Sequence, residues 1–144
     1  MPNERLRVYC DAEFENIESV VAELFLLANQ NKAEYSIAEL AAIATFLHNF
    51  YNGVENIFKR LLYAKGAALE NSSTWHKDLL RTTHDTGIIS TDLYNTLSNY
   101  LSFRHFFVHA YSFTLRWEEL RPLVAGLAET LKQVKAAVDD FVSR

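Results

Sequence analysis

The stretch from Leu93 to Phe113 constrains the fold more than any other segment, because Arg104 is its only charged residue. Charged residues make up 22% of the whole chain, so this stretch is unusually apolar. It contains no glycine or proline, and the Ser-Thr-Asp run at 90–92 offers good N-cap residues just before it. The pattern predicts one long central helix.

Placing successive residues about 100° apart around the helix axis puts Arg104 in the middle of an apolar arc. The arc consists of Leu97, Tyr100, Leu101, Phe107, Val108 and Tyr111, extended by Phe103, Phe106 and Ala110. The remaining strip holds Asn95, Ser98, Ser102, His105 and His109. A solvated face normally carries Glu and Lys, so this composition predicts a helix that is covered on nearly every side, with one narrow polar seam.

The arginine allows two interpretations. Its stem could cover apolar surface while the guanidinium reaches water or a carboxylate. Alternatively, the guanidinium could lie in a sheltered cleft, where its fork of donors suits a phosphate. His105 and His109 lie one turn apart beside it, and imidazole transfers protons near neutral pH. Such a group of side chains could support phosphoryl transfer without a metal ion.

Residues 104–111, Arg-His-Phe-Phe-Val-His-Ala-Tyr, resemble the Arg-x4-His-x-Tyr signature of HEPN domains. More narrowly, they resemble the HepT-type toxins that are encoded beside a minimal nucleotidyltransferase antitoxin. Segments 46–62, 75–80 and 116–123 are similar to that group in the same order, so the resemblance covers most of the chain from about Ile37. Many HEPN ribonucleases carry Asn or Asp directly after the arginine, whereas this chain has His105.

The resemblance implies the toxin of a toxin–antitoxin system, a metal-independent endoribonuclease that needs no cofactor and cleaves RNA, with tRNA as the target. Arg104 and His109 would be catalytic and His105 auxiliary. The antitoxin, using ATP and Mg²⁺, would neutralise the toxin by attaching AMP to Tyr111. The alternative is a non-catalytic helical accessory subunit whose groove presents a nucleotide or substrate to the nucleotidyltransferase.

Composition sets the remaining bounds. A chain of 144 residues with 49% hydrophobic residues, four glycines and two prolines predicts one helical domain over 1–144, which the resemblance implies is HEPN-like. A single cysteine, Cys10, and no recognisable signal peptide or membrane span predict a cytoplasmic protein. The net charge of −4 argues against unspecific binding of nucleic acid. RNA binding would need local positive charge from Arg104 of two chains, with some of Lys59, Arg60, Lys77, Arg81 and Arg116.

Four major helices are predicted, and they form an antiparallel up-down bundle. The first follows a short arm over residues 1–10, and the second runs from the S-x-x-E capping box at 36–39 to Gly66. The central helix comes third, and the last begins near Pro122, with a short turn at 75–81 in the linker. The broad apolar surface of the central helix predicts a two-fold homodimer through that helix.

Other groups are assigned bystander roles. His48, His76 and His84 are predicted to be structural or exposed, and Cys10 has no matched catalytic partners. Glu55 is predicted to lie on the polar side of its helix, where it could pair with a cation near the cleft, although an i, i+4 ion pair with Lys59 is preferred. His105 and His109 have the spacing of paired zinc ligands, but Phe106 stands where a zincin motif needs glutamate and no third ligand is evident.

Overall fold

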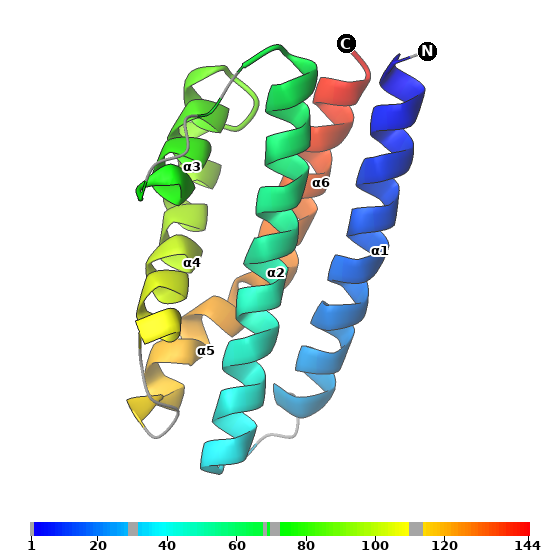
Figure 1. Cartoon of the computed structure of the whole chain (residues 1–144). Coiled ribbons are helices and arrows are strands. Elements are labelled where there is room, and N and C mark those ends of the chain that lie inside the picture. The colour runs from blue at the N-terminus through cyan, green and yellow to red at the C-terminus, as the bar shows by residue number, and fades with distance from the viewer. Residues whose placement is uncertain (1, 29–31, 68, 70–72, 110–113) are drawn as a thin grey trace.

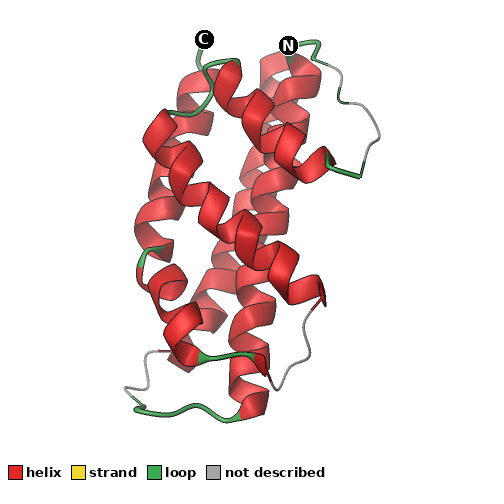
Figure 2. Cartoon of the chain, turned by 90° about the vertical axis from the view of Figure 1, so that its left-hand side faces the viewer, coloured by secondary structure: helices red, strands yellow, loops and turns green. Residues whose placement is uncertain are grey.

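The computed structural model describes residues 2–28, 32–67, 69, 73–109 and 114–144, and within them every regular element is a helix (Figure 2). The elements are α1 (Pro2–Ala28), α2 (Ile37–Ala64), α3 (Trp75–Asp85), α4 (Thr91–His109), α5 (Trp117–Ala125) and α6 (Leu127–Val142). The prediction of an all-α fold is confirmed, with six helices in the described residues rather than four. None of these helices is long and apolar enough to span a membrane.

Helix α2 lies between α1 on one side and α3 with α4 on the other (Figure 1). It is buried around most of its circumference, and Phe50, Tyr51 and Phe58 are almost completely inaccessible. The predicted capping box is present, since the Ser36 Oγ accepts from the Glu39 amide at 3.1 Å and a Glu39 carboxylate oxygen accepts from the Ser36 amide at 2.9 Å. Helix α2 ends at Ala64 with Lys65 as its C-cap residue, so the predicted C-cap, Gly66, lies one residue beyond the cap, where it adopts a φ of 82°.

Helix α1 begins at Pro2, so the prediction of an N-terminal arm over residues 1–10 is wrong. The reason is that Leu6 and Cys10 are buried and continue the helical spacing of Phe14 and Ile17 towards the N-terminus. The start of α1 lies beside the end of α6, where Arg7 pairs with Asp139 at 3.5 Å, and both termini lie at the same end of the molecule (Figure 1).

The C-terminal segment forms two helices, so the prediction that Pro122 begins the last helix is also wrong. Helix α5 starts at Trp117, because the buried side chains of Leu120 and Val124 hold this segment against the core on both sides of the proline. Gly126 then separates α5 from α6. The Tyr100 hydroxyl donates to the Leu123 carbonyl at 2.7 Å and fixes this break against α4.

Helix α4 starts as the sequence indicates, with the Ser90 hydroxyl accepting from the Leu93 amide at 3.1 Å. Its first half is anchored by the buried Leu93, Leu97 and Tyr100, but no residue from 101 to 109 is fully buried. Phe106 is 40% exposed and Val108 is 47% exposed. The prediction of a helix covered on nearly every side is therefore wrong for the single chain. The predicted continuation of this helix to Phe113 lies outside the described residues.

Candidate active site

A pocket of about 550 Å³ opens between α3 and the second half of α4. The linker helix α3 is longer than the predicted turn at 75–81, and its N-terminal half forms one wall of the pocket. The residues that line the pocket are Ser73, Thr74, His76, Lys77, Leu80, Arg81, Tyr94, Ser98, Leu101, Ser102, Arg104 and His105. The polar seam of α4 therefore forms the opposite wall. A sheltered position was predicted for this seam because it carries short neutral groups and imidazoles rather than Glu and Lys.

The charge of this pocket is positive. Lys77 and Arg81 come from α3 and Arg104 from α4, and no carboxylate stands among the described residues of the lining. Arg81 is partly neutralised by Asp78, which lies 2.9 Å from one guanidinium nitrogen. Lys77 and Arg81 are two of the cations that were predicted from the sequence to add positive charge near Arg104. A protein with a net charge of −4 thus gathers three cations around one pocket.

Arg104 holds the central position in this arrangement. Its side chain is half-buried, and within the described part of the chain no carboxylate lies within 4.0 Å of it. Its Nε is buried and has no hydrogen-bond partner among those residues. A snorkelling arginine would place its donors in water or on a carboxylate. An arginine with a buried, unpaired donor at a pocket of positive charge fits the second interpretation, in which it binds an anion.

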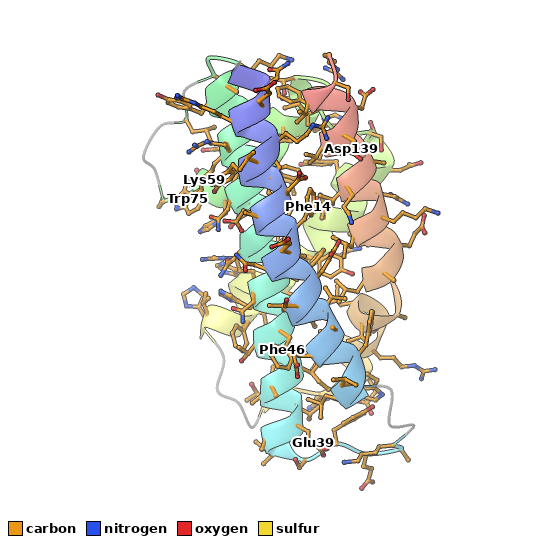
Figure 3. The ribbon with its side chains drawn as sticks, turned by 90° about the vertical axis from the view of Figure 1, so that its right-hand side faces the viewer. Phe14, Glu39, Phe46, Lys59, Trp75 and Asp139 are labelled. Atoms are coloured by element: carbon orange, nitrogen blue, oxygen red, sulfur yellow. The ribbon has the colours of Figure 1, made fainter. Side chains whose placement is uncertain are left out.

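Glu55 of α2, which is buried, pairs with the half-buried His76 of α3, with 2.7 Å between a Glu55 carboxyl oxygen and the His76 Nδ1. Only 3% of Glu55 is exposed, so the prediction that it lies on the polar side of α2 and pairs with Lys59 is wrong. The Lys59 ammonium instead lies over the Trp75 ring, 4.3 Å from its centre (Figure 3). The pair joins α2 to α3 at the pocket itself, because His76 belongs to the lining.

The electrostatics of the pair follow from burial. Burial raises the pKa of Glu55 to about 7, although the positive charges of Arg104 and Lys59 act in the opposite direction. Burial and the same two cations lower the pKa of His76 to about 4. Burial and Arg104 also lower the pKa of His48, whose ring meets Phe107 edge-on. Arg104 therefore influences the ionisation of groups on both α2 and α3.

The sequence contained a signal for Glu55 that was missed. Glu55 follows the buried Tyr51 by four residues and precedes the buried Phe58 by three, so it lies within the apolar arc of α2. The same argument had drawn attention to Arg104 on the central helix. His76 gave no comparable signal, because the short helix that carries it was predicted only as a turn.

The predicted site residues are only partly brought together. His105 lines the pocket beside Arg104, and its ring centre lies 4.9 Å from that of His109. His109 is exposed and lies about 140° from Arg104 around the axis of α4. Tyr111 falls within residues 110–113, outside the described residues. Among the residues that are described, no cluster of three or more His, Cys, Asp or Glu side chains could hold a metal ion.

Comparison with known proteins identifies the family. The model of a family described as HepT-like protein matches residues 42–144, which include α3, α4 and every residue of the pocket lining. No curated protein and no solved structure matches the chain. The family match agrees with the resemblance seen at residues 104–111. The chain therefore belongs to the HepT-like family, a HEPN nuclease-type family of toxin–antitoxin systems.

Proposed function

We propose that this protein is a toxin that cleaves RNA without a metal ion and is neutralised by AMPylation of Tyr111. The observation that carries the ribonuclease proposal is Arg104, whose guanidinium has a buried, unpaired donor at a pocket lined by three cations. Membership of a HEPN nuclease-type family supports the same chemistry. The RNA class that we propose as substrate is tRNA, on the strength of the family resemblance.

In the proposed reaction, the 2′-hydroxyl of one nucleotide attacks the adjacent phosphorus and the bond to the 5′-oxygen of the next nucleotide breaks. His109 accepts the proton of the 2′-hydroxyl or delivers a proton to the leaving 5′-oxygen. Arg104 binds the non-bridging oxygens, on which negative charge increases in the transition state. The products are a 2′,3′-cyclic phosphate and a free 5′-hydroxyl. His105 lines the pocket and is the candidate for the second proton-transfer group.

We further propose that the active protein is a two-fold dimer in which α4 lies near the axis. Phe106 and Val108 are large apolar side chains of α4 that are 40% and 47% exposed, and a partner subunit packed against α4 could cover them. Arg104 and His109 point in directions about 140° apart within one chain, so they do not converge on one phosphate. A partner subunit could supply the missing imidazole to each Arg104. Both pairs would then line one shared cleft.

AMPylation would switch the toxin off through charge and bulk. The Tyr111 oxygen would attack the α-phosphorus of ATP, which the antitoxin holds with Mg²⁺, and pyrophosphate would leave. The attached phosphate would be an anion close in sequence to Arg104, so it could occupy the guanidinium that otherwise binds RNA. Modification should therefore inhibit cleavage while the fold remains unchanged.

The decisive experiment for the ribonuclease proposal compares variants in cells and with purified protein. Expression of the chain alone should arrest growth, and purified protein should cleave RNA in the presence of EDTA. Arg104→Lys and His109→Ala should abolish both effects while leaving the helical circular dichroism unchanged. Growth arrest that persists in both variants would refute the assignment. No toxicity and no cleavage by the unaltered chain would favour the accessory-subunit alternative.

A further inference from the structure

The pocket between α3 and α4 is larger than one phosphate requires. Its volume of about 550 Å³ lies within the range of about 300–1,000 Å³ that is usual for small-molecule sites. Part of its wall is apolar or aromatic, formed by Leu80, Tyr94 and Leu101, and another part is formed by the hydroxyls of Ser98 and Ser102. These surfaces could accept a planar base and a ribose next to the cations.

The cations of the lining come from both helices that enclose this space. Lys77 and Arg81 follow one another by about one turn on α3, and Arg104 faces them from α4. Ser73, Thr74 and His76 bring the N-terminal end of α3 to the same wall, which adds partial positive charge from the helix. Asp78, which is not part of the lining, forms an ion pair with Arg81, and the buried Glu55 is bonded to the lining residue His76. The net charge of the side chains that line the pocket is therefore positive.

Tyr94 offers a surface for stacking. Its side chain is half-buried on α4, and its ring centre lies 5.0 Å from that of His84 on α3. Bases of single-stranded RNA stack on aromatic rings once they are released from a duplex. A base inside a duplex is paired and stacked on its neighbours, so it would have to leave the duplex before it could contact Tyr94 between α3 and α4.

We infer that this pocket is a subsite for one unpaired nucleotide of the RNA, next to the phosphate at Arg104. Tyr94 and the apolar wall contact the base, while Lys77 and Arg81 bind the phosphate of that nucleotide. The inference rests on the proposed function for the identity of the ligand as RNA. It restricts the substrate class to single-stranded segments such as loops and overhangs, and excludes continuous duplex.

The test measures binding without cleavage. The probe is a short fluorescent RNA strand with 2′-O-methyl groups, which lack the attacking hydroxyl, used either alone or annealed to its complement. Fluorescence anisotropy with the full-length protein should show tighter binding of the single strand. Lys77→Ala should weaken that binding roughly tenfold. It should also make the affinity less dependent on salt concentration, by the amount expected for the loss of about one phosphate contact. Lys132→Ala removes one exposed lysine from α6, outside the pocket, and is the matched control.

A second pair of variants tests the base contact. Tyr94→Phe keeps the ring and should bind the single strand as the unaltered protein does. Tyr94→Leu removes the ring and should weaken binding about tenfold, with circular dichroism confirming that the variant is folded. The inference is overturned if Lys77→Ala behaves like Lys132→Ala, if Tyr94→Leu behaves like Tyr94→Phe, or if the duplex binds as tightly as the single strand. Displacement of the probe by micromolar free AMP would also overturn it, because the pocket would then be a mononucleotide site.

This experiment separates the subsite from the catalytic proposal. If Arg104→Lys retained full cleavage, the catalytic assignment would fail, while the binding results would still stand. Conversely, equal binding by Lys77→Ala and Lys132→Ala would remove the subsite and leave the roles of Arg104 and His109 unaffected.

Discussion

The pair of Glu55 and His76 leads to a quantitative prediction about stability and pH. Burial raises the pKa of Glu55 from 4.5 to about 7 and lowers that of His76 from 6.5 to about 4. Between these values both groups are neutral in the folded protein, and the 2.7 Å contact between the Glu55 carboxyl and the His76 Nδ1 is a hydrogen bond between neutral groups. In the unfolded chain over most of the same range, Glu55 is ionised and His76 carries the proton.

The number of protons bound by the pair is therefore one in both states from about pH 4.5 to about pH 6.5. Stability depends on pH only where the folded and unfolded states bind different numbers of protons. The intact pair should therefore contribute almost no pH dependence in this range. The separate effects of Glu55 and His76 on the pH dependence of stability have opposite signs and cancel in the intact pair. Each effect should therefore appear when the other residue is substituted.

In Glu55→Gln only His76 remains to titrate, and its lowered pKa comes from burial, Arg104 and Lys59 rather than from Glu55. The unfolded chain then binds the extra proton, so stability falls as the pH decreases from 6.5 towards 4. In His76→Asn only Glu55 remains, and its raised pKa comes from burial. The folded state now binds the extra proton, so stability falls as the pH increases from 4.5 towards 7. Each full change amounts to about 3 kcal/mol at most.

The assay is urea unfolding followed by circular dichroism between about pH 4.5 and pH 7.5, at one fixed protein concentration. The slope of the unfolding free energy against pH should have opposite signs in Glu55→Gln and His76→Asn. The double variant should return to the slope of the unaltered protein, because all other titrating groups are shared. Parallel slopes in the two single variants would refute this account of the pair.

Three further outcomes are expected. Gly53→Ala should reduce the unfolding free energy by about 1–2 kcal/mol, although alanine has the better helix propensity, because the added Cβ would lie 2.5 Å from the buried Ile17 Cγ1. Thermal unfolding will measure this change, and an increase in stability would contradict it. Phe106→Glu should leave the monomer folded but abolish the proposed dimer in light scattering, and an unchanged mass would contradict the α4 interface. Tyr111→Phe should retain toxicity and escape the antitoxin with ATP and Mg²⁺, and intact-mass spectrometry that finds AMP on this variant would contradict the assigned position.

The sequence was most informative where one local rule determined the structure. The capping box at Ser36 and Glu39 was predicted correctly, and Ser90 was one of three predicted N-cap candidates. Gly66, predicted as the C-cap of α2, has a positive φ but lies one residue after the C-cap Lys65. Gly53 within α2 could mark either a close helix approach or a small defect, and the structure shows the close approach, because a Cβ there would lie 2.5 Å from the Ile17 Cγ1 of α1. The family resemblance at residues 104–111 agrees with the family match over residues 42–144.

The errors occurred where tertiary contacts outweighed local preference. Pro122 favours the start of a helix, but the burial of Leu120 before it and Val124 after it places it inside α5. The polar composition of residues 2–10 concealed two core positions, Leu6 and Cys10, that extend α1 to Pro2. In each case the spacing of buried side chains over several turns was a better guide than the average polarity of the segment.

The positions of Glu55 and Arg104 relative to one another could not be predicted from the sequence of either helix alone. Glu55 lies on the buried arc of α2 and Arg104 on the apolar arc of α4, and each in isolation is a costly charge in an apolar place. Opposite charges on the facing arcs of neighbouring helices lower that cost, provided that the helices are adjacent. Yet Glu55 is bonded to His76 rather than to Arg104, and its raised pKa leaves it largely neutral below pH 7. The guanidinium therefore keeps most of its charge available to the pocket, which is what binding of an external anion requires.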